Sequence, residues 1–133
     1  MISTNNDVDE LNRLSREAIG AAIEVHRNLG PGLLESAYES CLSWELRQRG
    51  FDVQNQVPVP IRYKGITLDE GYRIDLLVEG KLLLELKSID KVQPIHTAQV
   101  LTYLKMTGLK MALILKFNVL LMRSGITRIV NQL

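Results

Sequence analysis

The sequence predicts an α/β domain in which helices cover a β-sheet, and three observations lead to this class. Apolar residues recur at helical spacing over two segments near the N-terminus, alternating runs typical of strands follow, and a third helical segment interrupts the strands. The 133 residues are 46% hydrophobic and 23% charged, which is enough for one core without a disulfide or structural metal. We therefore expect a single domain, residues 1–133, with residues 1–8 as a flexible N-terminus.

Two helices open the predicted order. Apolar residues at spacings of three and four predict the first helix over residues 8–29, and Gly30-Pro31-Gly32 ends it. A second helical pattern continues from Leu34 until Gly50. It contains the single cysteine, Cys41, which we expect to be buried as a small apolar side chain.

The remaining elements are mostly strands. Extended runs cover residues 53–63, 72–78 and 81–88, with turn signals at Lys64-Gly65 and Glu79-Gly80. Pro58 and Pro60 favour an edge position for the first run, because proline cannot donate to a sheet ladder. A third helix is predicted over residues 95–107, and strands over residues 111–117, 119–123 and 126–130. The predicted order is ααβββαβββ.

Charged residues fall on one face of the central hairpin. Alternation places Asp75 on one face of its strand, and Glu85 and Lys87 on one face of the next. The apolar faces share a core only if odd positions pair with odd positions, so we predict a three-residue loop, 78–80, built as a type I turn with a bulge. Asp75 then lies opposite or diagonal to Glu85, with side chains about 5–8 Å apart at Cβ. Two carboxylates at that separation can close around one hard cation.

The spacing alone leaves a second interpretation open. Arg73 and Lys87 could form salt bridges with Asp75 and Glu85 on a solvated face, and short charged patterns of this kind arise often by chance. The local pattern therefore suggests a site without establishing one.

Longer motifs carry a resemblance to a known family. Asp75 followed by Glu85-Leu86-Lys87 resembles the D…ExK signature of the PD-(D/E)XK nuclease superfamily, and Gly32-Leu33-Leu34-Glu35-Ser36-Ala37-Tyr38 resembles the motif that names the GxxExxY proteins. The resemblance runs from about Leu11 to Val130 and includes residues 26–32, 98–104 and 125–130. It implies a restriction-endonuclease-like fold of three layers, a central mixed sheet flanked by helices.

The resemblance also implies roles for individual residues. Asp75 and Glu85 would hold Mg²⁺, or Mn²⁺ in its place, with Glu35 and the backbone carbonyl of Leu86 as further ligands. Lys87 would position the attacking water or counter developing negative charge. Gln99 and Tyr103 look like the QxxxY element that orients the lysine or the nucleic acid. The alternative for Glu35 is a first-turn glutamate that favours the helix dipole. Tyr38, His26 and His96 are expected to pack or form hydrogen bonds rather than react.

The implied function is Mg²⁺-dependent hydrolysis of phosphodiester bonds in nucleic acid, with DNA favoured over RNA. The alternative is a catalytically silent nuclease-fold protein that binds nucleic acid or acts as an adaptor. The net charge is only +1, yet residues 1–80 hold eight Lys/Arg against thirteen Asp/Glu and residues 81–133 hold eight against two. This asymmetry suits a phosphate-contacting face, although solvated lysines would produce it equally well.

Partners and location follow from size and from the apolar pattern. A chain this short has few residues to spare for gripping a polymer, which favours a homodimer or a protein partner. The first ten residues show no basic segment followed by an apolar run, and no stretch approaches the length of a membrane span. We therefore expect no membrane partner and a cytoplasmic, bacterial-type location.

Overall fold

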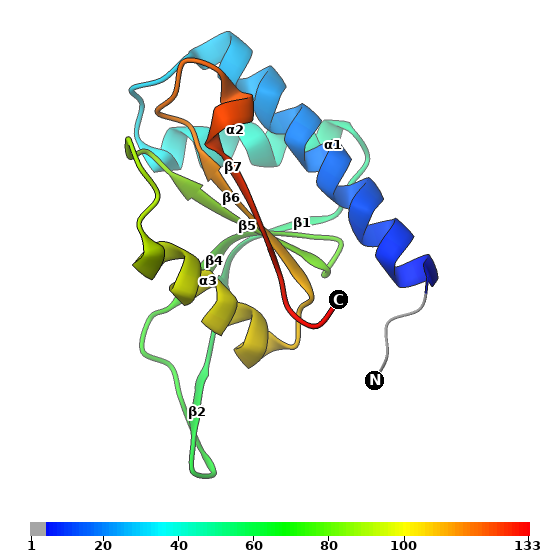
Figure 1. The fold of residues 1–133 in the computed structure, drawn as a ribbon, viewed down its shortest axis with the longest axis vertical. Helices are drawn as coiled ribbons and strands as arrows, with labels where there is room; N and C mark the ends of the chain where they lie inside the picture. The colour runs from blue at the N-terminus through cyan, green and yellow to red at the C-terminus, as the bar shows by residue number, and fades with distance from the viewer. Residues whose placement is uncertain (1–4) are drawn as a thin grey trace.

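The computed structural model describes residues 5–133 and shows a mixed five-stranded sheet between helices (Figure 1). The strand order is β1-β4-β5-β6-β7, with β5 and β6 parallel and the other neighbours antiparallel. A separate hairpin consists of β2 and β3. The elements are α1 (Asn5–Leu29), α2 (Glu35–Gln48), β1 (Val53–Pro58), β2 (Ile61–Tyr63), β3 (Ile66–Leu68), β4 (Arg73–Val78), β5 (Leu82–Lys87), α3 (Pro94–Thr107), β6 (Met111–Lys116), the 3-10 helix η1 (Met122–Gly125) and β7 (Ile126–Val130).

The sheet separates two hydrophobic cores. One core joins α1 and α2 to leucines such as Leu76, Leu84 and Leu86, and the other joins α3 to residues such as Leu83 and Ile114. Figure 1 shows α1 and α2 on one side of the strands and α3 on the other. This is the three-layer α/β arrangement of a restriction-endonuclease-like fold, as the sequence predicted. The crossover from β5 through α3 to β6 explains the second covered face, because parallel neighbours need a helical connection.

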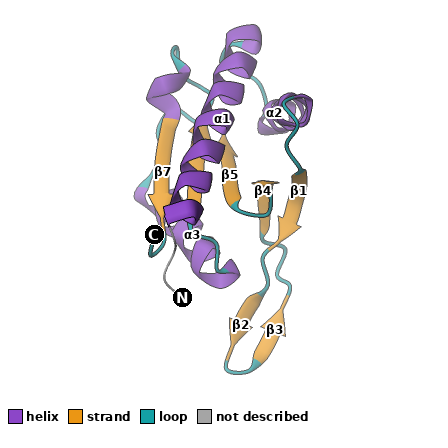
Figure 2. Cartoon of the chain, turned by 90° about the vertical axis from the view of Figure 1, so that its right-hand side faces the viewer, coloured by secondary structure: helices purple, strands orange, loops and turns teal. Residues whose placement is uncertain are grey.

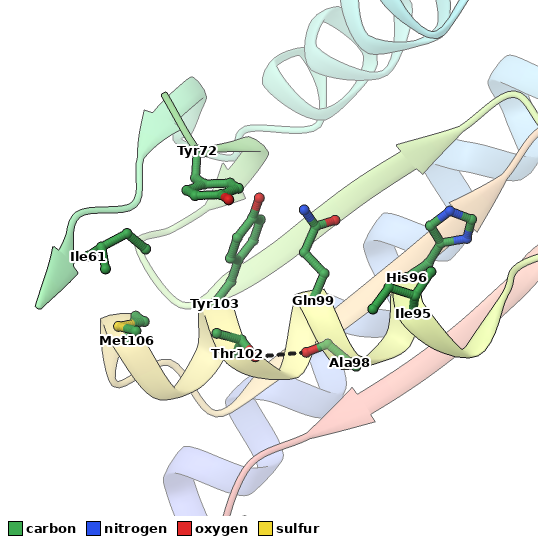
Figure 3. A pocket seen from close by; sticks show the side chains of 9 residues that line it. All are labelled: Ile61, Tyr72, Ile95, His96, Ala98, Gln99, Thr102, Tyr103 and Met106. Atoms are coloured by element: carbon green, nitrogen blue, oxygen red, sulfur yellow. Dashed lines mark hydrogen bonds between the residues drawn. The ribbon is translucent and has the colours of Figure 1, made fainter. Parts of the chain in front are cut away.

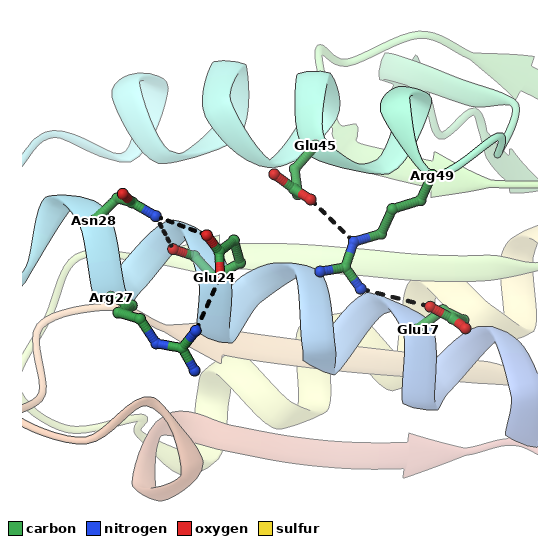
Figure 4. Close-up of polar contacts among 6 residues, drawn as sticks. All are labelled: Glu17, Glu24, Arg27, Asn28, Glu45 and Arg49. Atoms are coloured by element: carbon green, nitrogen blue, oxygen red, sulfur yellow. Dashed lines mark hydrogen bonds and ion pairs between the residues drawn. The ribbon is translucent and has the colours of Figure 1, made fainter.

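Polar contacts join the two helices of the first layer. The guanidinium of Arg49, just after α2, lies 3.0 Å from Glu45 and 3.5 Å from Glu17 of α1 (Figure 4). Within α1, Glu24 pairs with Arg27 at 3.1 Å and accepts hydrogen bonds from Asn28. These contacts are exposed, so the buried stripe of α1 contributes more to the layer than they do.

The first predicted strand differs from the structure in its length. The run 53–63 is broken after Pro58 into β1 and β2, because Pro58 and Pro60 flank the buried Val59 and lack the donors that would continue a ladder. The edge position of β1 is confirmed. The β2–β3 hairpin projects away from the five-stranded sheet, as Figures 1 and 2 both show.

Three further predictions about local structure were wrong. No strand covers residues 119–123; Leu120 and Leu121 are 90% and 71% exposed, and the segment leads into η1. Cys41 is exposed rather than buried, because the buried face of α2 runs through Tyr38, Leu42 and Leu46. Residues 5–8, which the sequence assigned to a flexible N-terminus, already belong to α1, and residues 1–4 lie outside the described part of the chain.

Candidate active site

The β4–β5 register confirms the predicted pairing of faces. Leu76 lies opposite Leu84, and the same register places Asp75 opposite Glu85. Leu76 and Leu84 pack into the α1/α2 core, whereas the α3 side carries the neighbouring odd-numbered positions. The two carboxyl groups therefore meet at the point where the paired part of the hairpin ends.

Two details of the predicted hairpin were wrong. The loop is residues 79–81 rather than 78–80, because Val78 pairs with Leu82, and Glu79 joins Gly80 in the left-handed region with φ values of 54° and 65°. The face that carries the acids is also not a solvated one. Leu77 and Leu83 are buried under α3, and Ile74 packs in that second core instead of beside Leu76. The acids consequently lie at the edge of a covered core.

The backbone pairing of β4 with β5 ends at Leu76 and Leu84, and beyond it the two carboxylates accept hydrogen bonds from backbone amides. The amide of Asp75 donates to Glu85 Oε1 at 3.2 Å, and the amide of Leu86 donates to Asp75 Oδ2 at 2.8 Å. Each acid is thus held by the backbone of the opposite strand. Among the described residues, no hydrogen-bond donor reaches Glu85 Oε2, so this oxygen is available to bind a cation.

Burial makes this pair of acids electrostatically unfavourable. Glu85 is only 5% exposed. Its burial and, next, the charge of Asp75 raise the Glu85 pKa from 4.5 to about 8. Burial also raises the pKa of Asp75, with Glu39 and Glu35 adding to the effect while the Leu86 amide and Gln56 oppose it. Protons or cations are therefore taken up readily here.

Two residues at the site were missed from the sequence. Gln56 of β1 lies opposite Asp75 in the extended register, and its Nε2 donates to Asp75 Oδ1 at 3.3 Å and to Glu39 Oε1 at 2.6 Å. Its φ of 54° is a left-handed conformation that costs a non-glycine residue free energy. Helical spacing could have indicated Glu39, one turn after Glu35, but Gln56 becomes a neighbour only once β1 pairs with β4.

The Gly32–Tyr38 motif fixes where α2 begins. The Tyr38 ring is fully buried and stacks on Phe117 at 4.3 Å. Its hydroxyl donates to the Gly30 carbonyl at 2.6 Å and accepts from the Leu33 amide at 3.1 Å. The hydroxyl thus closes the loop between α1 and α2, and the expectation that Tyr38 packs and forms hydrogen bonds is confirmed.

That loop delivers Glu35 to the end of β5. Glu35 Oε2 accepts from the Ser88 amide at 3.1 Å, one residue after Lys87. The buried Ser88 Oγ has no hydrogen-bond partner among the described residues. The charge of Glu35 raises the pKa values of both acids, but its carboxylate is bonded to the backbone and forms no three-acid metal group with them among the described residues.

The salt-bridge interpretation of the hairpin was wrong. Arg73 pairs with Asp69 at 3.0 Å. Within residues 5–133, no ion pair joins Lys87 to either acid, although its charge lowers the Glu85 pKa somewhat. The acid pair therefore has no fixed cationic partner, and Lys87 stands two residues from it on the same face of β5.

Gln99 and Tyr103 lie on α3 beside a cavity, and both point from the helix toward the strands (Figure 3). Burial raises the Tyr103 pKa, and the charges of Glu85, Tyr72 and Asp75 add to that effect. The Tyr103 ring centroid lies 6.1 Å from that of Tyr72, which stands three residues before Asp75. No hydrogen bond links Gln99 to Lys87 among the described residues, so the implied contact with the lysine is not formed here.

Both histidines make ordinary hydrogen bonds. His26 Nε2 lies 2.7 Å from the Val119 carbonyl oxygen, and His96 Nδ1 accepts from the Gln93 amide at 3.0 Å. The second contact caps the first turn of α3. These contacts agree with the expectation that His26 and His96 have structural roles.

The donor set suits a hard divalent cation. Mg²⁺ needs one or two carboxylates and keeps several waters or takes phosphate oxygens, and Asp75 and Glu85 provide such a pair. No group of three or more His, Cys, Asp or Glu side chains is poised to hold a metal within residues 5–133. The pair fits a partly hydrated ion.

The structure combines a mixed sheet in three layers with two paired acids where the β4–β5 pairing ends and a lysine two residues after Glu85. The family model of the PD-(D/E)XK nuclease superfamily matches residues 12–129, and the chain belongs to this superfamily. Such nucleases generally use divalent metal ions and act on nucleic acid. No curated protein and no solved structure matches the chain. None of the helices described is long and apolar enough to cross a membrane.

Proposed function

We propose that the protein is a Mg²⁺-dependent nuclease that hydrolyses phosphodiester bonds, with DNA preferred over RNA and Mn²⁺ as a substitute for Mg²⁺. The observation that carries the proposal is the buried Asp75–Glu85 pair, which has no cationic side chain bonded to it among the described residues. The preference for DNA rests on the sequence resemblance alone. Membership of the GxxExxY family, a homodimer or protein partner and a cytoplasmic location remain predictions.

The proposed ligands are Asp75, Glu85 and the Leu86 carbonyl, with Glu35 as a further acid. A divalent cation at this place would polarise the phosphate and make the attacking water more acidic. Asp75 and Glu85 are oriented by backbone amides of the facing strand, so their oxygens need little rearrangement. Gln56 of the neighbouring strand β1 also donates a hydrogen bond to Asp75 and helps to hold it in place. This preorganisation favours catalysis, because fixed groups need not reorient as charge develops.

Lys87 is proposed to act on the phosphate or on the water. Lys87 forms no salt bridge among the described residues, so its positive charge can offset negative charge on the phosphate. Gln99 and Tyr103, one turn apart on α3, are proposed to orient the nucleic acid from the opposite side of the site.

The test combines cleavage with metal binding. Labelled single- and double-stranded DNA and RNA are incubated with the parent protein or with Lys87→Ala, in Mg²⁺ or Mn²⁺. Cleavage by the variant should fall by about a hundredfold or more, the loss expected when a group that stabilises transition-state charge is removed. Calorimetry should show Mg²⁺ affinity that is unchanged or slightly higher, since a positive charge near the ion is lost.

The same experiment separates a nuclease from an adaptor. An adaptor with the nuclease fold would bind nucleic acid without Mg²⁺ uptake at the acid pair and without cleavage. Cleavage by Lys87→Ala at the parent rate would contradict the assigned role of the lysine.

A further inference from the structure

A cavity of about 470 Å³ lies between α3 and the segment that leads from β2 into β4. Figure 3 shows Ile61 and Tyr72 on one side of it and Met106, Tyr103 and Gln99 of α3 on the other. Its walls are mainly apolar and aromatic. Coordination of a cation and hydrolysis of a phosphodiester do not require such a surface, so the cavity needs a separate explanation.

Tyr103 connects this cavity to the acid pair. Its side chain lines the cavity, and its ring centroid lies 6.1 Å from that of Tyr72, which directly precedes β4 and stands three residues before Asp75. A phosphate held at the acids would therefore have one of its own nucleosides next to the cavity. The neighbouring part of the substrate is the natural candidate for the occupant.

The walls match the chemistry of a nucleobase. The Tyr72 side chain is 42% exposed, and its ring meets Tyr103 edge-on, with an interplanar angle of 61°. It stacks face to face with no other ring among the described residues, which leaves it available to a flat ligand. Met106 is a flexible, polarisable side chain, and the Gln99 amide can both donate to and accept from a base edge. Such a site tolerates any base, since each has a π-face.

A base in a duplex is paired and stacked, and it cannot enter a protein cavity without leaving the helix. We propose that this cavity binds one unpaired nucleobase next to the phosphate that is cut, so that the preferred substrate is single-stranded nucleic acid. The inference rests on the proposed nuclease function for the position of the cut, but binding of the base itself does not require turnover.

Binding is measured first without metal, so that turnover does not enter. Fluorescein-labelled oligothymidylate and the same strand in a duplex are titrated with the full chain in EDTA, with fluorescence anisotropy as the readout. The single strand should bind more tightly. Tyr72→Ala should weaken its binding about tenfold, the scale of one lost stacking contact, and Tyr72→Phe should restore it.

A matched control comes from the β2–β3 hairpin. Tyr63 is 58% exposed and lies outside the cavity, so Tyr63→Ala should bind the single strand as the parent does. Thermal unfolding of each variant checks the fold. Met106→Ala, on the opposite wall, repeats the test if Tyr72→Ala proves unstable, and it should also weaken binding.

The decisive measurement moves a single abasic position along the strand. At one position the missing base should weaken binding to the parent but add nothing to the loss in Tyr72→Ala, because both changes remove the same contact. Independent effects at every position, equal binding of the duplex, or an equal loss in Tyr63→Ala would overturn the base site.

Failure of this inference can be told apart from failure of the nuclease proposal. Coupling between Tyr72 and one base without cleavage in Mg²⁺ or Mn²⁺ would leave the base site standing and refute the nuclease. Cleavage without such coupling would support the nuclease and refute the base site. If both hold, the cut should stay at a fixed distance from the coupled position.

Discussion

Replacing Glu85 with glutamine should stabilise the metal-free protein at alkaline pH and leave its stability in acid nearly unchanged. The side chain is 5% exposed and faces Asp75, and these conditions raise its pKa from 4.5 to about 8. Glutamine keeps the size of the side chain and can still accept the hydrogen bond from the Asp75 amide. It differs in never becoming charged.

The free energy of unfolding falls as pH rises because the unfolded chain releases the Glu85 proton at a lower pH than the folded chain does. Below pH 4.5 the carboxyl is protonated in both the folded and the unfolded chain, so its contribution to stability is fully present. Between 4.5 and about 8 the unfolded chain loses the proton while the folded one retains it, and the free energy of unfolding falls as pH rises. Above pH 8 the loss is complete. At 1.36 kcal/mol per pKa unit, the shift corresponds to about 5 kcal/mol, a large part of a small domain's stability.

Urea unfolding in EDTA at pH 5 and pH 9 measures this difference. With a slope of about 2 kcal/mol per molar urea, the variant's midpoint at pH 9 should exceed that of the parent by about 2.5 M. Glu70→Gln is the matched control, because Glu70 is exposed and lies outside the site. It should show no gain that depends on pH.

Added Mg²⁺ gives the complementary result. The ion should stabilise the parent at pH 8, because it binds the folded acid pair, and should do much less for Glu85→Gln. A gain in the variant that is equal at pH 5 and pH 9, or destabilisation at both, would refute the reasoning that Glu85 is an unfavourable buried charge.

Three other predictions concern the surroundings of the acids. Asp75→Asn should weaken Mg²⁺ binding in calorimetry and abolish cleavage, while circular dichroism shows that the fold survives. Tyr38→Phe should lower the free energy of unfolding by about 1 kcal/mol, because the partly buried Gly30 carbonyl and Leu33 amide lose a partner; an unchanged urea midpoint would contradict this. Nucleic-acid binding should weaken steeply with salt, and Lys105→Glu should reduce the slope of log K against log salt by about one if that lysine contacts a phosphate.

The sequence predicted those parts of the fold that depend on residues close together in the chain. Odd and even positions of the hairpin could be separated because a slip of one residue would exchange its faces. The end of α3 could be placed because Gly108 adopts the left-handed conformation that closes a helix, with φ of 77°. In both cases the relevant information lies within a few residues.

The alternation of the hairpin did not predict that its acid-bearing face is covered by α3, although the sequence carries a signal for it. Leu82–Leu84 and Met111–Leu115 are continuous apolar runs, typical of strands that are buried on both faces. Strict alternation along β5 predicts that Leu83 shares a polar face with Glu85 and Lys87. The parallel pairing of β5 with β6, through α3, is what buries it.

The contact between Gln56 and Asp75 could not have been predicted in the same way. The two residues are nineteen positions apart and meet only because β1 pairs with β4. The contact also depends on the left-handed backbone conformation of Gln56, which is rare for residues other than glycine. The predicted strand over residues 119–123 was wrong for a different reason. An apolar run was interpreted as a strand, but a Cβ at Gly125 would lie 2.0 Å from the Lys116 carbonyl oxygen, so the chain turns back tightly here instead of extending.

The distinction between a structural acid pair and a cation site depends on where the positive charge comes from. A structural pair would be neutralised by a neighbouring side chain, and Arg73 of the same strand is suitably near, yet its guanidinium pairs with Asp69. Backbone amides and Gln56 hold the carboxylates in place without supplying a full charge. The unfavourable free energy of burying two carboxylates is offset by the leucines that fill the core on both sides of the hairpin. The free energy that the acid pair subtracts from the metal-free fold is therefore recovered when a cation binds, and the pH dependence of Glu85→Gln measures the same quantity that favours metal uptake.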